Sequence, residues 1–379
     1  MVCKRVVVLG DGSAGLMVVN KLRVLNSRKK LELVLVGKNP YHYFKPDGIQ
    51  IPFGFKEYEQ SVKPNKFLVN YGVQYLADEA IKVDVENRNV KLKSGSELNY
   101  DFLVIATGDR FTPDDVPGYR ESAVHFYDLE HTLELRTMME NFRGGDIVIG
   151  RASEPIQCPP APYEFTLLLD EYLRKRGLRD KTNIKYLYPI DGVFSIANVS
   201  RLISRIFDER GIEHYSNFNV ESADHEKKKI ISYEGESLKF DLLVLVPPHR
   251  GQQFLTDSGL ADEYGYVDVN PGNLLYGGTD DVYVIGDATN LPIAKSGSAA
   301  HMEASFVARR ITSEVTGYPT EEHLEGKIAC FTETGMGKAI TLYYSHSEPP
   351  KVKFQSRFDH ILKWTSSDTY FSGLLRGLF

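Results

Sequence analysis

The sequence predicts an α/β protein with two parallel-sheet units, the second inserted into the first, and a C-terminal segment of different character. Two mainly aliphatic runs, residues 5–9 (Arg-Val-Val-Val-Leu) and 146–149 (Asp-Ile-Val-Ile), each precede a turn and a helical pattern, as strands buried on both faces of a parallel sheet do. A glycine-rich turn follows the first run. The expected boundaries are residues 1–110 and 246–325 for the first unit, 111–245 for the inserted unit and 326–379 for the C-terminal segment.

Composition narrows the class of protein. A chain of 379 residues with 42% hydrophobic and 25% charged residues is an ordinary globular protein of two or three domains, not a disordered one. A net charge of −6 argues against a nucleic-acid binder, and three cysteines are too few for a disulfide framework. No apolar run approaches the ~18 residues of a spanning helix, and the chain enters its first strand without a signal-peptide pattern. We therefore expect any membrane attachment to be peripheral, at one face of the cell membrane.

The glycine turn of the first unit reads Gly10-x-Gly12-x-x-Gly15 and lies between a predicted strand and a predicted helix. This context is that of a Rossmann-like dinucleotide site, in which the helix N-terminus binds the pyrophosphate. We expect five residues of the turn to contact the cofactor: Gly10, Gly12, Ser13, Ala14 and Gly15.

The carboxylate that usually ends the second strand of such a unit and bonds the ribose is missing. The sequence there is Val36-Gly37-Lys38-Asn39, so Lys38 or Asn39 is expected to bond the ribose instead. Lys38 would also suit a 2′-phosphate, and this position alone leaves NADP open.

Two later stretches, residues 100–108 and 281–288, resemble the paired signatures of flavoproteins with two dinucleotide-binding domains. This resemblance implies FAD and tandem Rossmann-like FAD/NAD(P)-binding domains, with Asp287 bonding the ribityl chain. The other expected cofactor contacts are Ala80, Ala106, Thr107, Gly108, Gly286, Lys295 and Gly297.

The second unit lacks the glycine fingerprint that a nicotinamide site requires. Only Gly150 remains, and prolines follow where a phosphate-binding helix should begin. Cys158 lies in this altered turn, and Cys330 lies far along the chain. A lone buried cysteine usually acts only as a small hydrophobic residue. A redox role for these two cysteines is therefore expected only because of the motif around Cys158.

That motif, residues 158–164 (Cys-Pro-Pro-Ala-Pro-Tyr-Glu), resembles the cysteine motif of sulfide:quinone oxidoreductases. The resemblance extends to residues 247–251, residues 295–297 and the late Cys330. It implies a membrane-associated flavoprotein in which hydrosulfide attacks a Cys158–Cys330 bridge. FAD would then pass two electrons to a quinone, and the product would be polysulfide or sulfur.

Several residues receive supporting roles from this resemblance. His131 and Glu164 are candidates for proton transfer, Lys295 for stabilising the reduced flavin, and Phe331 for contacting quinone. Each also has a purely structural alternative. Many relatives carry a third redox cysteine four residues before the histidine, and here Tyr127 holds that position.

The C-terminal segment is expected to lie on the membrane surface. Phe358, Ile361 and Leu362 share one helical face, and residues 371–378 repeat the i, i+3, i+4, i+7 pattern beside several basic residues and the single tryptophan, Trp364. The alternative is a helix docked on the body of the protein or on another subunit.

Other functions stay open at this point. A type II NADH:quinone dehydrogenase would share the fold and the quinone, although the degenerate second turn argues against it. A flavoprotein acting on another sulfur compound or electron carrier is a further alternative, and homo-oligomerisation is not decided by the sequence.

Overall fold

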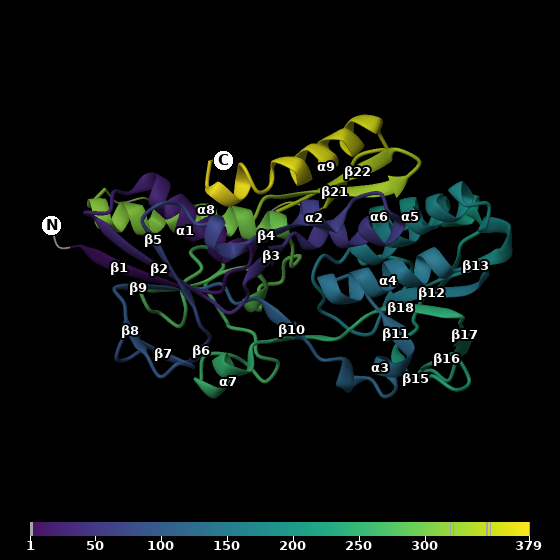
Figure 1. Cartoon of the computed structure of the whole chain (residues 1–379), viewed down its shortest axis with the longest axis horizontal. Coiled ribbons are helices and arrows are strands. Elements are labelled where there is room, and N and C mark those ends of the chain that lie inside the picture. Colours follow the sequence, from purple (N-terminus) through teal and green to yellow (C-terminus); the bar gives the residue numbers. More distant parts are fainter. Residues whose placement is uncertain (1–2, 319, 321, 346–347, 349, 379) are drawn as a thin grey trace.

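The computed structural model describes residues 3–318, 320, 322–345, 348 and 350–378. Figure 1 shows two α/β units side by side, with the C-terminal segment lying across both. Each unit is built on a five-stranded parallel sheet. The α/β class with Rossmann-like sheets is therefore the observed one.

The first sheet has the strand order β20-β9-β1-β2-β5. Its strands are β1 (Lys4–Leu9), β2 (Leu31–Gly37), β5 (Val73–Ala77), β9 (Phe102–Ile105) and β20 (Val282–Val284), and helices α1 (Ser13–Leu25) and α8 (Gly297–Thr316) pack on one face. The central strands are buried because their side chains are aliphatic on both faces.

The second sheet has the order β11-β18-β12-β13-β14 and lies between β9 and β20 in the chain. Its strands are β11 (Ala123–Val124), β12 (Gly145–Arg151), β13 (Thr182–Leu187), β14 (Glu213–Tyr215) and β18 (Leu242–Val246). Its helices are α4 (Leu129–Asn141), α5 (Ala161–Lys175) and α6 (Ala197–Arg210). The chain crosses between the units through the antiparallel pair β10 (Asp109–Phe111) and β19 (His249–Gly251).

Small elements complete the two units. Three antiparallel groups are β3 (Tyr41–Tyr43) with β4 (Val62–Pro64), β6 (Ala80–Asp84) with β7 (Asn89–Leu92) and β8 (Glu97–Asn99), and β15 (Val220–Asp224) with β16 (Lys229–Ser232) and β17 (Ser237–Lys239). Short helices are α2 (Tyr58–Ser61), α3 (Tyr119–Ser122) and α7 (Gln253–Asp257).

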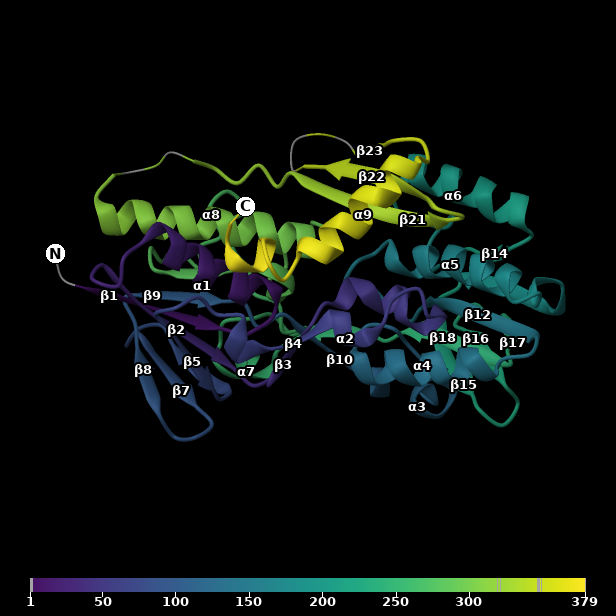
Figure 2. The same ribbon diagram turned by 45° about the horizontal axis from the view of Figure 1, so that its top comes forward.

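The C-terminal segment forms an antiparallel sheet, β21 (Ile328–Gly335), β22 (Lys338–Tyr344) and β23 (Lys351–Val352), with helix α9 (Arg357–Thr369) lying over it (Figure 2). Among the described residues, no helix is both long and apolar enough to span a bilayer.

The pattern at residues 371–378 does not form the helix that its periodicity predicts. Gly373 and Gly377 interrupt it, Gly377 with a positive φ of 72°, and only a 3-10 turn at Leu374–Arg376 remains. Leu375 is fully buried, and its carbonyl accepts a hydrogen bond from the Asn20 amide on α1 at 2.7 Å, whereas Leu378 is exposed. Leu375 thus docks this end of the chain on the first unit.

Candidate functional site

The glycine turn forms the junction between β1 and α1, as the motif requires. Gly10 has a φ of +104°, and a Cβ there would lie 2.3 Å from the Ala106 carbonyl oxygen. A Cβ on Gly15 would lie 1.8 Å from the Gly10 oxygen, so strand and helix approach closely only because both residues are glycines. A Cβ on Gly12 meets nothing within 4 Å, and no side chain caps the helix there. Free N–H groups thus face open space, which fits a pyrophosphate.

A carboxylate does lie near the end of β2, but it belongs to Asp11 of the glycine turn and is bonded by protein groups. Asp11 Oδ2 accepts hydrogen bonds from the Asn39 backbone N–H at 3.1 Å and the Asn65 amide at 2.8 Å. A Cβ on Gly37 would lie 2.2 Å from the Asp11 Cγ, so the glycine makes room for this side chain. Asn39 is thus held by Asp11, whereas Lys38 Nζ bonds Glu79 at 2.9 Å and gives no support to a 2′-phosphate site.

A group of unsatisfied polar atoms marks the place for the flavin ring. Of the buried side-chain atoms that have no hydrogen-bond partner among the described residues, four gather here: Thr107 Oγ1, Asp109 Oδ2, His249 Nε2 and Tyr266 OH. They come from the end of β9, from the β10–β19 pair and from a loop that returns to the first unit. Buried polar groups are rarely left unpaired, and an isoalloxazine ring with its nitrogen and carbonyl atoms would satisfy such a set. The residues present therefore fit FAD.

Charges of both signs surround this place. Lys295 is buried, and its Nζ donates to the carbonyl oxygens of Asp287 at 2.9 Å and Thr289 at 2.7 Å. Burial, together with the charge of Asp109, raises the pKa of Asp287 to about 6. Burial likewise raises the pKa of Asp109 to about 6, although Lys45 opposes the shift. With FAD bound, Lys295 would offset negative charge on the reduced ring.

Other expected cofactor residues lie around the same edge. Ala106, Thr107 and Gly108 follow β9, Gly286 and Asp287 follow β20, and Gly297 begins α8. Ser13 shares a hydrogen bond of 2.7 Å with the Tyr370 hydroxyl of the C-terminal segment. Ala80 is buried at the start of β6, directly after Glu79, the partner of Lys38.

The corresponding turn of the second unit is filled by side chains. Arg151, at the end of β12, is buried; it forms an ion pair with Glu154 and lies 4.1 Å from the centre of the Tyr188 ring. Cys158 follows with a φ of 45°, and its backbone N–H donates to the Lys295 carbonyl oxygen. Instead of cradling a phosphate, this turn brings the cysteine to the edge of the first unit.

Cys158 and Cys330 are both free, half-buried thiols, and they come together with a shared set of neighbours. Burial raises the pKa of Cys158, and charges on Glu164 and Cys330 raise it further. Burial also raises the pKa of Cys330, whose Sγ accepts a hydrogen bond from the Tyr344 hydroxyl at 3.6 Å. A hydrogen bond from Tyr127 to the Cys158 carbonyl oxygen, at 3.4 Å, places this tyrosine beside the first thiol.

Glu164 lies beside both thiols and is almost fully buried. Its carboxylate forms an ion pair with Lys363 of α9 and accepts the Glu333 backbone N–H at 2.7 Å. Phe331, next to Cys330 on β21, is partly buried. Sequence reasoning assigned Lys363 to a basic surface, but its charge lies inside the protein.

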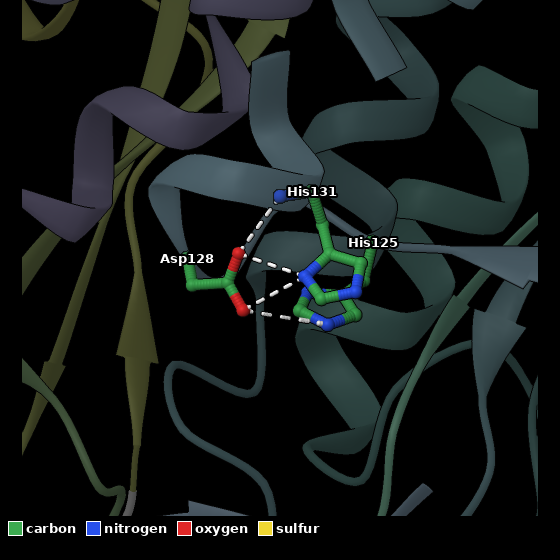
Figure 3. A group of neighbouring side chains, drawn as sticks. All are labelled: His125, Asp128 and His131. Atoms are coloured by element: carbon green, nitrogen blue, oxygen red, sulfur yellow. Dashed lines mark hydrogen bonds and ion pairs between the residues drawn. The ribbon is translucent and has the colours of Figure 1, made fainter. Parts of the chain in front are cut away.

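His131 belongs to a group of side chains at the start of α4 (Figure 3). His125, Asp128 and His131 place ligand atoms within 4.8 Å of one another. Asp128 caps the helix and accepts from the backbone N–H of His131 at 2.9 Å, and it also bonds the Nδ1 of that residue at 2.9 Å. His125 Nδ1 accepts the Tyr127 N–H at 3.2 Å, so a neutral His125 carries its proton on Nε2, where a metal would need a lone pair. The group is a hydrogen-bonded helix cap. None of the contacts described for it joins His131 to either thiol.

Sequence reasoning missed Asp11, Asp109, Arg151 and Lys363. Asp109 directly follows the expected Thr107-Gly108 turn, and its position there was the available signal. Lys363 and Arg151 acquire their roles only from partners on other elements.

Comparison with known proteins shows which proteins this chain is similar to. A family model for pyridine nucleotide-disulphide oxidoreductases matches residues 4–150. The chain is 26% identical to a mitochondrial sulfide:quinone oxidoreductase of Dictyostelium discoideum, over 98% of this chain and 86% of that protein. It is 25% identical to a sulfide-quinone reductase of Aquifex aeolicus over 88% of this chain and 81% of that protein.

The solved structure of the Aquifex aeolicus sulfide:quinone oxidoreductase has the same fold, with a TM-score of 0.87 at 23% identity, over 99% of this chain and 92% of that one. A type II NADH:quinone oxidoreductase of Staphylococcus aureus is 25% identical over 84% of each chain. These matches confirm the resemblance expected from the sequence, and they confirm FAD as the cofactor.

Proposed function

We propose that this chain, an FAD-dependent oxidoreductase similar to sulfide:quinone oxidoreductases over nearly its whole length, oxidises sulfide and passes two electrons to a membrane quinone. The observation that carries the proposal is the convergence of Cys158 and Cys330, far apart in the sequence, beside one buried carboxylate and one buried ammonium group. The names of the relatives point to the same donor and acceptor.

The sulfur chemistry takes place at the two cysteines. Hydrosulfide attacks Cys158 in an oxidised Cys158–Cys330 bridge; the bridge breaks, a new S–S bond forms on Cys158, and Cys330 leaves as a thiolate with the electron pair. FAD, when bound, supplies the two-electron acceptor between this pair and the quinone. The Cys158 persulfide and the Cys330 thiolate would then join in a bridge that is one sulfur atom longer, and this step releases one proton and gives two electrons to FAD. The next hydrosulfide attacks the longer bridge, and the sulfur chain is finally released as polysulfide or sulfur.

The supporting residues act on charge and protons. Glu164 lies close enough to the thiols to take up a proton released from hydrosulfide. Lys295 holds positive charge at the cofactor edge through two carbonyl hydrogen bonds. We propose Phe331 as a quinone contact because it is next to Cys330 on β21, the strand over which α9 lies. Proton transfer by His131 would need a route through solvent or intervening groups, since Asp128 holds its Nδ1.

We also propose that α9 lies on the membrane surface. Its outward side chains Phe358 and Ile361 are 66% and 58% exposed, and Phe354 just before it is 89% exposed. Such a group of exposed apolar side chains suits partial insertion at the headgroup level. Quinone would then reach the protein from the bilayer beneath this helix.

Anaerobic titration of the flavin absorbance tests the proposal. Sulfide should bleach the flavin, a quinone analogue should restore it, and NADH should leave it unchanged. Bleaching by NADH instead would favour the type II NADH dehydrogenase reading that the Staphylococcus relative suggests. A flavin that neither donor bleaches would reject both.

A further inference from the structure

Helix α9 has an outward apolar side and one cation turned inward. The Lys363 side chain is only 13% exposed and forms an ion pair with Glu164, whereas Lys351 and Lys353, just before the helix, are exposed. The membrane proposal gives the buried lysine no function. A buried ammonium group is costly unless it is paired, so its position requires an explanation of its own.

We infer that Lys363 is a positioning residue of the thiol pair: its ammonium group, held by Glu164, stabilises the anionic form of Cys158 and Cys330. The inference deepens the proposed function and rests on it for the sulfur chemistry. It also makes docking of α9 a condition for a reactive pair, because only this helix carries the cation into the site.

The surroundings of the thiols support this role. The titratable and polar groups that face them come from five elements: Tyr163 and Glu164 of α5, Lys363 of α9, Tyr344 of β22, Ser296 before α8, and Tyr127 after β11. Lys363 is the one cation in this set. Burial raises the pKa of both thiols and the Glu164 charge raises it further, while Lys363 lowers it. Since the thiolate is the reactive form, Lys363 acts against the other charged neighbour.

Further carboxylates keep Lys363 protonated. Burial alone would lower the pKa of Lys363, but the charges of Glu164 and Glu333 raise it above its ordinary value. Glu333 in turn bonds His360 Nδ1 at 2.8 Å, and the His360 side chain is 31% exposed. The cation is thus fixed between two carboxylates, one of which is tied to the surface.

The test measures how fast the thiols react at different pH values, and it needs neither sulfide nor quinone. The FAD-loaded protein is reduced with dithiothreitol, the reductant is removed, and alkylation by iodoacetamide is followed peptide by peptide with mass spectrometry from pH 6 to 10. Cys3, which is exposed, serves as an internal reference in every sample. In Lys363→Gln we expect both site thiols to react roughly tenfold more slowly at a given pH. The reason is that the thiolate fraction falls tenfold when the midpoint of thiol ionisation, read from the dependence of the alkylation rate on pH, rises by about one pH unit.

Glu164→Gln should have the opposite effect, because it leaves Lys363 unopposed: the thiols react faster and their midpoint falls. A merely structural role predicts faster alkylation in both variants, since loosened packing exposes the thiols. Lys363→Arg should restore the wild-type midpoint, and Lys353→Gln, at an exposed lysine of the same segment, should not change it.

Should Lys363→Gln fail to fold, Glu164→Gln and the double variant Glu164→Gln/Lys363→Gln still decide. The double variant is expected between the two single effects, and a wild-type midpoint in Glu164→Gln overturns the inference. So do shifts of the same sign in the two single variants. Failure of sulfide to bleach the flavin would reject the proposed function and would leave these midpoints as they are, so the two failures can be told apart.

Discussion

The two sheets of this protein carry equivalent turns that have become different sites. Each turn follows a central parallel strand and leads to a helix, β1 to α1 in the first unit and β12 to α5 in the second. In the first, Gly12 leaves open space above the helix N-terminus. In the second, Arg151 fills the turn and Cys158 adopts a left-handed conformation. The position that binds a dinucleotide in one copy of the fold presents a thiol in the other.

The two sites also treat buried carboxylates differently. Glu164, beside the thiols, has a lysine partner in Lys363. Asp109, at the cofactor edge, keeps one oxygen without a partner among the residues that the structure describes. The thiol site thus satisfies its charges within the chain, whereas the cofactor site leaves polar atoms for a ligand.

Replacing either thiol of the pair should abolish sulfide-dependent flavin reduction and leave FAD binding intact. In Cys158→Ser and Cys330→Ser we expect no sulfide-dependent flavin reduction, because serine cannot form the S–S bond, while FAD stays bound by the first unit. Anaerobic stopped-flow absorbance measures the bleaching. Cys3→Ser, which changes the exposed cysteine directly before β1, is the control. Bleaching at the wild-type rate in either site variant would remove the proposed mechanism.

The next variant fills the open turn of the first unit, at Gly12. Its φ of −75° and ψ of −169° suit a β-branched residue, and the space above it is open, so Gly12→Val should fold. The valine would occupy the place of the pyrophosphate, and FAD affinity should fall by roughly a hundredfold, equivalent to about 3 kcal/mol. The ratio of flavin to protein absorbance after gel filtration measures the loss, and circular dichroism reports the fold.

Gly54→Asn is the matched control for this experiment. Gly54 also has open space around it, and asparagine tolerates its φ of 65°. A Gly12→Val protein that retains stoichiometric FAD would contradict the assignment of the turn.

The first turn could be predicted from the sequence because its geometry is local. Gly15 is required by a contact with the Gly10 oxygen within the same strand–turn–helix, and the positive φ of Gly10 is likewise a property of the turn, so both leave a motif. The likeness around Cys158 was also readable as a motif. The fold class followed from the aliphatic runs, which are buried as expected.

The rest depends on contacts between distant segments. Lys363 meets Glu164 across 199 residues, and no periodicity distinguishes it from the exposed lysines of the same segment. The helix predicted for residues 371–378 is not formed because Gly373 and Gly377 interrupt it, and an apolar stripe does not identify the surface that its residues contact. Asp11 was overlooked because the expected carboxylate was sought at the end of β2 and not within the turn.

A smaller effect is expected at α9, which lies over β21 and β22. Phe358→Ser with Ile361→Ser should weaken binding to liposomes at least about tenfold, because each apolar side chain contributes roughly 1.5–3 kcal/mol when buried. Sulfide-dependent flavin bleaching in solution should stay near wild type, since neither side chain belongs to the thiol site. Co-sedimentation with vesicles measures the binding. Tyr233→Ser, at a tyrosine that is 72% exposed on the second unit, should bind as wild type does, and equal binding by the double variant would remove the membrane role of α9.

The smallest effect concerns Asp109, the carboxylate of the cofactor site that lacks a partner for one oxygen, and it is measured as a change in thermal stability with pH. The pKa of Asp109 is raised to about 6, above its ordinary value near 4, so the native state binds this proton more tightly than the unfolded state does. Its contribution to stability therefore falls as pH rises from 4 to 6 and stays low above that. Asp109→Asn removes this cost, and the FAD-free protein should melt roughly 2–4 °C higher at pH 7.5, with little change at pH 4.5. The exposed Asp268→Asn should show no such pH dependence. An equal shift for Asp109→Asn at both pH values would mean that the carboxylate is already satisfied, and that the two sites handle buried charge in the same way.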